Sequence, residues 1–312
     1  MSYLVSPDIV PAAGSPSPTG SGPQLVIVPA AGSPSPTGSG PQLVTASSKP
    51  SVSVVIPTLN EARNLPWVLA RIPQFVDELI IVDGHSSDQT VQVARAVRAD
   101  VVVVMADRRG KGAAIRAGFA VATADLIVML DADGSMDPAE IGWYATLLGS
   151  SFDFVKGSRY ITGGASDDLT WLRDHGNRVL TGLANAACHS HFSDLCYGYV
   201  GLRRECLPLL DLTSDGFEIE TELVMRAARA GLRIAEVPSH ELDRLSGASH
   251  LRTFRDGWRV LRTLGREWSG WEPSTAGAPV EALRRVSYQL SSDEGTRVPA
   301  DPMLPLGDAA VP

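Results

Sequence analysis

The chain has 312 residues, of which 44% are hydrophobic and 20% charged, and its formal net charge is −8. This composition is typical of a water-soluble globular protein with one large domain or two small ones. The chain lacks the basic excess of nucleic-acid-binding proteins, and its apolar runs are much shorter than the roughly 20 residues that cross a bilayer. Nucleic acid is therefore not an expected partner, and we expect no membrane-spanning helix.

The three cysteines, Cys188, Cys196 and Cys206, bear on the compartment of the protein. A small, odd number of cysteines in a long chain argues against a disulfide framework and favours a reducing environment. No charged segment followed by an apolar one opens the chain, so a secretory signal is not predicted. We therefore expect a cytoplasmic protein.

Both ends of the chain are predicted to lack a fold. The segment at residues 9–26 is rich in proline, glycine and serine, and it is repeated at once without change. Two such copies cannot bury enough apolar surface to offset the entropy cost of ordering. Residues 1–50 are therefore predicted to be a disordered leader, and 269–312 a flexible acidic tail with one short helix near 280–289. The folded domain is expected at residues 51–268.

Within this domain, short apolar strands alternate with amphipathic helices. The pattern predicts four strands and three connecting helices, in the order 52–57, 62–71, 78–82, 89–97, 101–105, 111–122 and 126–130. Alternating strands and helices of this length form parallel sheets with right-handed crossovers. Because ligands bind beyond the carboxyl ends of such strands, the candidate loops are those that begin at Pro57, Asp83, Asp107 and Asp131.

The fourth of these loops carries two carboxylates. Asp131 and Asp133 follow the strand at 126–130 directly and are separated by one residue. Carboxylates in this position can face one crevice, and their hard oxygens suit Mg²⁺ or Mn²⁺ holding a diphosphate. The alternative is an Asx turn that leads into the helix after Asp137 and Pro138.

Four motifs in sequence resemble those of the family 2 glycosyltransferases. They are Pro-Thr-Leu-Asn-Glu at 57–61, Asp-Gly at 83–84, Gly-Lys-Gly at 110–112 and Asp-Ala-Asp-Gly at 131–134. The resemblance covers residues 52 to about 264. It implies the α/β class and a GT-A fold, that is, a Rossmann-like nucleotide-diphospho-sugar transferase domain whose central, mostly parallel sheet is flanked by helices.

The resemblance also implies roles for individual residues on the donor side. Asp131 and Asp133 would bind the metal and the diphosphate, and the other donor-binding residues would be Pro57, Leu59, Glu61, Asp83, Lys111 and Ser135. Lys111 begins a predicted helix, where its ammonium and the helix N-terminal amides can meet a phosphate. The alternative is an exposed lysine without a partner. His85 is expected to be a solvated turn residue.

The second half resembles the polyprenyl-phosphate glycosyltransferases of the dolichyl-phosphate mannose synthase type. The matching segments are 155–160, 163–164, 171–178, 194–204, 216–220 and 244–250. By this resemblance, Arg159 and Arg173 face the acceptor phosphate. A loop that contains Arg244, Ser249 and His250 would close over the donor diphosphate. The implied catalytic residues are Asp133, Arg159, Arg173 and Arg244.

A phosphate acceptor also fits the chemistry of the residues. A sugar hydroxyl must lose a proton as it attacks, so its transferase needs a carboxylate base, whereas a phosphate is already anionic and needs cations to position it. Many family 2 enzymes have Glu-Asp where this chain has Glu220 and Thr221. We therefore expect inverting, metal-dependent transfer of a hexose from GDP-mannose or UDP-glucose to a polyprenyl phosphate.

Two alternatives remain open. In the first, the donor site is the same, but the acceptor is a small soluble hydroxyl compound and Glu220 is the base. In the second, the protein binds a nucleotide-sugar without turnover.

Residues 251–268 combine apolar side chains at helical spacing with five arginines. A basic helix with aromatic side chains can lie on an anionic membrane surface, which would place a cytoplasmic protein at the inner face of the membrane. The alternative is a helix that packs its apolar stripe on the domain and exposes its arginines to water.

Overall fold

The computed structural model describes residues 49–247, 253–269 and 284–285. The predictions of a disordered leader at 1–50 and a flexible tail at 269–312 fall almost entirely on other residues and stay predictions. Ser249 and His250 also lie outside the described residues. Cys188, Cys196 and Cys206 are all free thiols, as expected.

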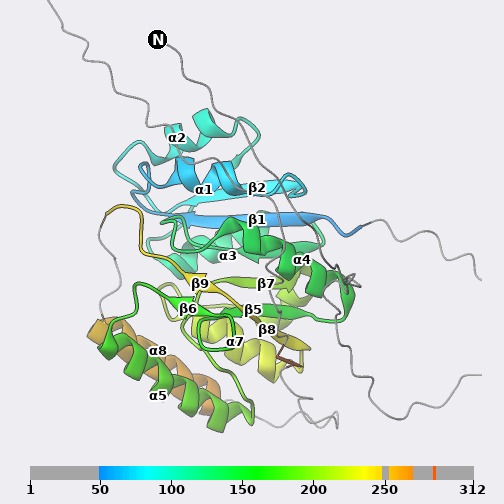
Figure 1. Ribbon diagram of the computed structural model, residues 1–312, viewed down its shortest axis with the longest axis vertical. Coiled ribbons are helices and arrows are strands. Elements are labelled where there is room, and N and C mark those ends of the chain that lie inside the picture. The colour runs from blue at the N-terminus through cyan, green and yellow to red at the C-terminus, as the bar shows by residue number, and fades with distance from the viewer. Residues whose placement is uncertain (1–48, 248–252, 270–283, 286–312) are drawn as a thin grey trace, which may run out of the picture. The chain divides into compact units, whose positions relative to one another are not determined.

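The centre of the domain is a mixed sheet whose strands run in the order β10-β8-β5-β7-β4-β1-β2-β3 (Figure 1). Their bounds are β1 Val52–Thr58, β2 Glu78–Asp83, β3 Val102–Met105, β4 Leu126–Met129, β5 Phe154–Ser158, β7 Val200–Arg203, β8 Ile234–Pro238 and β10 Arg284–Arg285. Within this sheet β7 is antiparallel to β4 and β5, and the other pairings are parallel. The predicted α/β fold with a mostly parallel sheet is therefore confirmed.

A second, small sheet pairs β6 (Ala165–Ser166) with β9 (His240–Glu241) in parallel. β9 follows β8 almost at once, and the chain between them passes Ser239. The pair ties the segment after β5 to the segment after β8, beyond the carboxyl ends of both strands.

Helices cover both faces of the main sheet. They are α1 Leu65–Arg71, α2 Thr90–Val97, α3 Lys111–Val121, α4 Ile141–Ser150, α5 Trp171–Cys188, α6 Leu207–Leu210, α7 Ile219–Arg229 and α8 Thr253–Ser269, with short 3₁₀ helices η1 Pro138–Glu140 and η2 Arg204–Cys206. In β1, Val54 and Ile56 join the core under α1 and α4, whereas Val55 joins the core under α3 and α7. This alternation explains why β1 is apolar throughout, since both of its faces are buried.

The prediction of a short helix near 280–289 is wrong for the two residues of that range that the structure describes. Arg284–Arg285 form β10, which pairs in parallel with β8. The free edge of β8 offers unpaired backbone N–H and C=O groups to residues 284–285, although the two segments are far apart in the sequence. Pairing with this edge outweighs local helix propensity. The other residues of the predicted helix lie outside the described ranges.

The predicted helix at 251–268 corresponds to α8, which packs against both α5 and α7. Val260 and Leu264 belong to the core shared with those helices. Among the described residues, no helix is long and apolar enough to cross a bilayer.

Candidate active site

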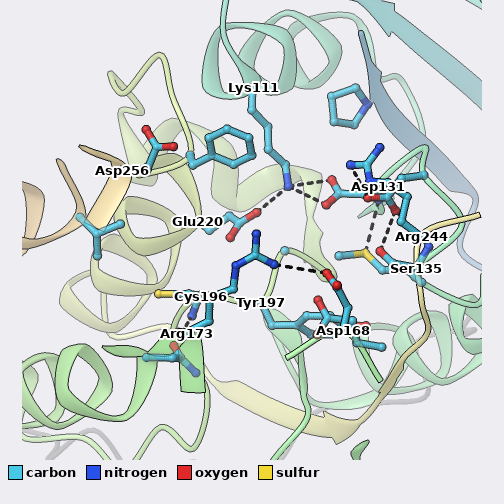
Figure 2. Close-up of a pocket in the computed structure, with 18 of the residues that line it drawn as sticks. Lys111, Asp131, Ser135, Asp168, Arg173, Cys196, Tyr197, Glu220, Arg244 and Asp256 are labelled. Carbon is cyan, nitrogen blue, oxygen red and sulfur yellow. Dashed lines mark hydrogen bonds and ion pairs between the residues drawn. The ribbon is translucent and has the colours of Figure 1, made fainter. Parts of the chain in front are cut away.

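A cavity of about 380 Å³ opens at the carboxyl ends of β1 and β4 (Figure 2). The start of α3 and side chains from α5, α7 and α8 complete its wall. It collects ten of the residues that the sequence singles out: Pro57, Leu59, Glu61, Lys111, Asp131, Asp133, Ser135, Arg159, Arg173 and Arg244. These residues therefore lie together beyond the strand ends, where the parallel sheet predicts a ligand site, and their individual roles stay predictions.

Asp133 takes part in two different interactions. Its Oδ1 accepts hydrogen bonds from the backbone N–H and the hydroxyl of Ser135, at 3.0 and 2.6 Å, so an Asx turn is present. Its Oδ2 lies 2.8 Å from Nη2 of Arg244, which crosses from the loop after β9. The turn fixes the direction of the carboxylate, so that Oδ2 is the oxygen that meets the guanidinium of Arg244.

Lys111 joins two carboxylates from different elements. Its Nζ lies 2.7 Å from Asp131 Oδ1 and 2.6 Å from Glu220 Oε1 (Figure 2). Burial alone would lower the pKa of Lys111, but these carboxylates outweigh burial and raise it. Lys111 is thus a cation in the wall of the cavity, and the alternative of an exposed lysine without a partner is wrong.

The glycines beside Lys111 allow close packing rather than anion binding. A Cβ on Gly110, whose φ is +133°, would collide with the carbonyl of Asp215, and one on Gly112 with the carbonyl of Ser214. The N–H groups of Gly112 and Ala113 both donate to Asp215 O. The prediction that the first amides of this helix meet an anion is therefore wrong for these two, because a backbone carbonyl already occupies them.

Glu220 is a buried carboxylate at the start of α7. Burial raises the pKa of Glu220, although its ion pair with Lys111 opposes the shift. The hydroxyl of the next residue, Thr221, is buried and has no hydrogen-bond partner among the described residues. Both residues line the cavity, and so does Asp256 of α8.

Arg244 bridges the loops that follow β1 and β4. Its Nη1 lies 3.0 Å from Glu61 Oε1, while its Nη2 pairs with Asp133. Burial raises the pKa of Glu61, although hydrogen bonds from Asn64 and Arg244 oppose the shift. One guanidinium therefore connects the predicted nucleoside pocket with the predicted diphosphate site.

The two predicted acceptor arginines differ in how firmly they are held. Arg159 is only 7% exposed; its Nε lies 2.8 Å from Asp194 Oδ2 and its Nη1 lies 3.0 Å from Glu241 Oε2. Arg173 is 25% exposed, and its Nη1 lies 3.3 Å from Oδ2 of the half-exposed Asp168. Arg173 is consequently the freer of the two to turn toward a ligand.

Glu241 was missed by sequence reasoning. It lies on the two-residue strand β9 and accepts a hydrogen bond from Arg159, and the hydroxyl of Ser166 on the paired strand β6 also donates to it. No spacing or motif in the sequence marks so short a strand. Asp194, by contrast, could be found, because the segment that begins at this residue matches the family pattern.

The predicted nucleoside side contains a buried, half-satisfied carboxylate. Asp83 accepts a hydrogen bond from Ser86 N at 3.0 Å, but its Oδ1 has no partner among the described residues. A buried acceptor without a partner costs about 1–3 kcal/mol. Asp83 is absent from the cavity wall, so its contact with a nucleoside stays a prediction. The neighbouring Gly84 lines the cavity, and His85 is an exposed turn residue with φ of +70°, as expected.

Glu140 ties the loop after β4 to the link between β8 and β9. Its carboxylate accepts hydrogen bonds from the Ser239 hydroxyl and the His240 N–H, at 2.5 and 3.3 Å. Burial raises the pKa of Glu140 from 4.5 to about 7, and the hydrogen bond from Ser239 only partly offsets it.

This raised pKa predicts a pH-dependent stability. Because folded Glu140 holds its proton more tightly than the unfolded chain does, its contribution is complete below about pH 4.5 and is lost as the pH rises through about 7. The wild type is expected to lose up to about 3 kcal/mol of unfolding free energy over this window, and Glu140→Gln is expected not to. Urea denaturation at several pH values measures the difference. Parallel pH profiles of the two proteins would contradict the assignment.

The aspartates suit a divalent cation. Asp131 and Asp133 present hard carboxylate oxygens to one cavity, which is the donor chemistry that Mg²⁺ and Mn²⁺ prefer. Among the described residues, no group of three or more His, Cys, Asp or Glu side chains could hold a metal ion by itself. The remaining ligands would therefore be diphosphate oxygens and water.

The fold and the cavity together define a GT-A glycosyltransferase, an enzyme that uses an activated sugar. The chain belongs to glycosyl transferase family 2, whose model matches residues 53–208. It is 35% identical over 219 residues to an uncharacterized glycosyltransferase of Mycobacterium tuberculosis, covering 68% of this chain and 98% of that one. It is 31% identical to an undecaprenyl-phosphate mannosyltransferase of Micrococcus luteus, covering 70% and 96%.

A solved structure resembles the domain as well. It is glucosyl-3-phosphoglycerate synthase from Mycobacterium tuberculosis in complex with Mn²⁺, uridine diphosphate and glucosyl-3-phosphoglycerate. The TM-score is 0.56 at 25% identity, and the match covers 73% of this chain and 83% of that one. The predicted family and fold are thus confirmed.

Proposed function

We propose that this enzyme transfers a hexose from a nucleotide-sugar to a polyprenyl phosphate, with inversion and with a divalent cation at the donor diphosphate. The observation that carries the proposal is the mixed character of the acceptor end of the cavity. Arg173 lines the same cavity as the apolar side chains of Leu172, Leu180 and Val260. A cation beside an apolar wall suits an acceptor with a phosphate and a hydrocarbon chain, whereas a small polar acceptor has no use for that wall.

The donor side follows from the charges around Asp131 and Asp133. A bound Mg²⁺ or Mn²⁺ would supply positive charge to the leaving diphosphate. Lys111 and Arg244 contact these aspartates, so they are placed to neutralise charge that develops on the same phosphates. Ser135 holds Asp133 in position, and the free Oδ1 of Asp83 is suited to an N–H of the base.

On the acceptor side, Arg173 is proposed to orient the attacking phosphate oxygen toward the anomeric carbon. Arg159, held in ion pairs by Asp194 and Glu241, would be a rigid second contact for the phosphate. Because the nucleophile is already an anion, orientation and charge are what the protein must supply. Single in-line displacement inverts the anomeric centre.

Relatives support this choice of substrates. The Micrococcus luteus relative is named for undecaprenyl phosphate and mannose, and the mycobacterial structure holds uridine diphosphate with Mn²⁺. GDP-mannose and UDP-glucose are therefore the donors to test first. Incubation of each with undecaprenyl phosphate and Mg²⁺ or Mn²⁺ should yield lipid-extractable sugar and free nucleotide in equal amounts. Nucleotide release that is indifferent to the lipid would contradict the acceptor.

An alternative function keeps the donor site but uses a small soluble hydroxyl acceptor with Glu220 as base. It is favoured by the position of Glu220 in the cavity and by the raised pKa of this carboxylate, since a raised pKa makes a carboxylate a stronger base. A protein that binds the donor without turnover is a further alternative, and it would show donor binding with no nucleotide release.

Glu220→Gln separates these functions. With a phosphate acceptor, the variant is expected to lose less than about tenfold in turnover, because no proton has to be removed. With a hydroxyl acceptor, the loss should be about 10²–10⁴-fold. Steady-state rates with both acceptor types measure this, with donor affinity as the control for the lost contact to Lys111. A steep loss with polyprenyl phosphate would overturn the base-free mechanism.

A polyprenyl chain lies in a bilayer, so the proposal requires contact with a membrane surface. Residues 251–268 are proposed to contribute to this contact peripherally, at the inner face of the membrane. Within the described part of this segment, α8 exposes Trp258 and Trp268.

A further inference from the structure

Large exposed apolar side chains gather on two helices of the domain. Trp171 is 78% exposed and Trp258 is 68% exposed, although each indole would gain free energy by leaving water. The exposed apolar side chains of these helices are Trp171, Leu172, Val179 and Leu183 on α5, and Trp258, Leu261 and Trp268 on α8. Single exposed apolar residues are ordinary, but a cluster on adjacent elements indicates a contact surface.

The outward face of α5 is a continuous, mostly apolar stripe. Trp171, His175, Val179 and Leu183 are four residues apart, so they lie above one another on one side of the helix, and all are exposed. The ring of His175 stacks on that of Trp171, with centroids 5.8 Å apart. The helix packs its opposite side, including Ala184 and Cys188, into the core.

The outward face of α8 is cationic. Its two acidic residues, Asp256 and Glu267, are buried, at 6% and 2% exposure. Its exposed basic residues are Arg255, Arg259, Arg262 and Arg266. Arg266 pairs with the buried carboxylates of Glu222 and Glu267, and Arg259 lies 4.0 Å from Asp256. Arg255 and Arg262 have no acidic partner among the described residues, so they carry the unbalanced charge of this helix. This helix therefore presents positive charge and indole rings together.

The two helices border the acceptor end of the cavity. α5 and α8 pack side by side (Figure 1), and the cavity wall includes Leu172 and Leu180 from α5 and Val260 from α8. Leu172 is itself 45% exposed, so apolar lining reaches from the outer surface to the neighbourhood of Arg173. An amphiphile that enters here would meet hydrocarbon first and the cation next.

We propose that the outward faces of α5 and α8 form one surface that docks on an anionic lipid bilayer, with the acceptor end of the cavity toward the lipid. Indole rings suit the boundary between headgroups and acyl chains, and arginines suit anionic headgroups. A second copy of this chain fits less well, because a twofold contact would set the arginines of α8 against each other. The docking surface rests on the proposed function only for the identity of the acceptor.

Binding of the full chain to vesicles tests the surface without any sugar transfer. We expect it to co-sediment with phosphatidylcholine vesicles that contain phosphatidylglycerol, and to bind pure phosphatidylcholine much more weakly. Arg255→Gln combined with Arg262→Gln should weaken binding by about thirtyfold. Trp171→Ser combined with Trp258→Ser should weaken it by at least about tenfold. The matched charge control, Arg71→Gln with Arg95→Gln on α1 and α2, should leave binding unchanged.

Three outcomes would overturn the docking surface. They are equal binding to both kinds of vesicle, equal loss in the α1 and α2 control, and a lipid-independent dimer that the tryptophan substitutions dissociate, as measured by light scattering. Measurements of sugar transfer test the identity of the acceptor separately from docking. The α5 and α8 variants should retain turnover with a short, water-soluble isoprenyl phosphate and lose it with vesicle-embedded undecaprenyl phosphate. Vesicle binding without transfer to either lipid would reject the proposed acceptor and leave the docking surface standing.

Discussion

Replacing Asp131 or Asp133 by asparagine is expected to lower turnover by about a thousandfold. Each substitution keeps the size of the side chain but removes a carboxylate that faces the cavity and would hold the cation on the donor diphosphate. Loss of this charge stabilisation corresponds to about 4 kcal/mol in the transition state. Steady-state release of nucleotide, with lipid acceptor and Mn²⁺ present, measures the effect.

Asp137→Asn is the matched control for these variants. Asp137 lies in the same loop and caps η1 by accepting a hydrogen bond from Ala139 N, and asparagine caps almost as well. It is absent from the cavity wall, so its turnover should stay within about threefold of the wild type. Similar losses in all three variants would mean that the loop fold, and not the paired carboxylates, is what matters.

Arg173→Ala is expected to lower kcat/KM for the acceptor by about a hundredfold and to change the donor dissociation constant by less than about twofold. The reason is its position. Arg173 lines the cavity on α5, whereas the diphosphate contacts are assigned to residues that contact Asp131 and Asp133. Acceptor titrations at saturating donor, together with donor binding by calorimetry, separate the two effects.

Arg178→Ala provides the comparison on the same helix. Arg178 is 62% exposed and pairs with Asp174 one turn away, outside the cavity wall. The substitution Arg178→Ala removes the same charge from α5. It should leave kcat/KM for the acceptor and the donor dissociation constant nearly unchanged. If Arg173→Ala impaired donor binding as strongly as acceptor use, the proposed division of roles would be wrong.

The first four strands of the sheet and the edge at which the cavity opens were predictable because they depend on local pattern. The apolar strands at 52–57 and 126–130 are buried on both faces and therefore read as unbroken runs, and the polar residues that follow them meet at one edge of a parallel sheet. β10 was not predictable, since its two arginines form a strand only through pairing with β8.

Within the site, sequence reasoning located Lys111 but not its environment. The ion pair with Glu220 joins residues 109 positions apart, and no periodicity encodes such a contact. The contact of Asp215 O with the first amides of α3 is equally nonlocal, and it replaced the anion site that a Gly-Lys-Gly sequence suggests. The same limit applies to Glu241, whose role depends on the pairing of β6 with β9.

For α8, periodicity predicted an amphipathic helix but left its partner open. The packing of its apolar residues on the domain is confirmed, whereas contact with a membrane stays a prediction. Val260 and Leu264 pack into the core, while Trp258 and Trp268 remain exposed on the same helix. The helical periodicity of apolar residues identifies the apolar face of a helix, but only the packed structure shows which of these residues remain exposed.

Calorimetric titration of nucleotide-sugars into the full chain, with and without Mn²⁺, tests the cation-bound diphosphate site most directly. We predict saturable heat with GDP-mannose or UDP-glucose when Mn²⁺ is present, and loss of that heat with a chelator or in Asp133→Asn. Binding that is equally strong without a divalent cation, or no heat from either donor with Mn²⁺ supplied, would contradict it.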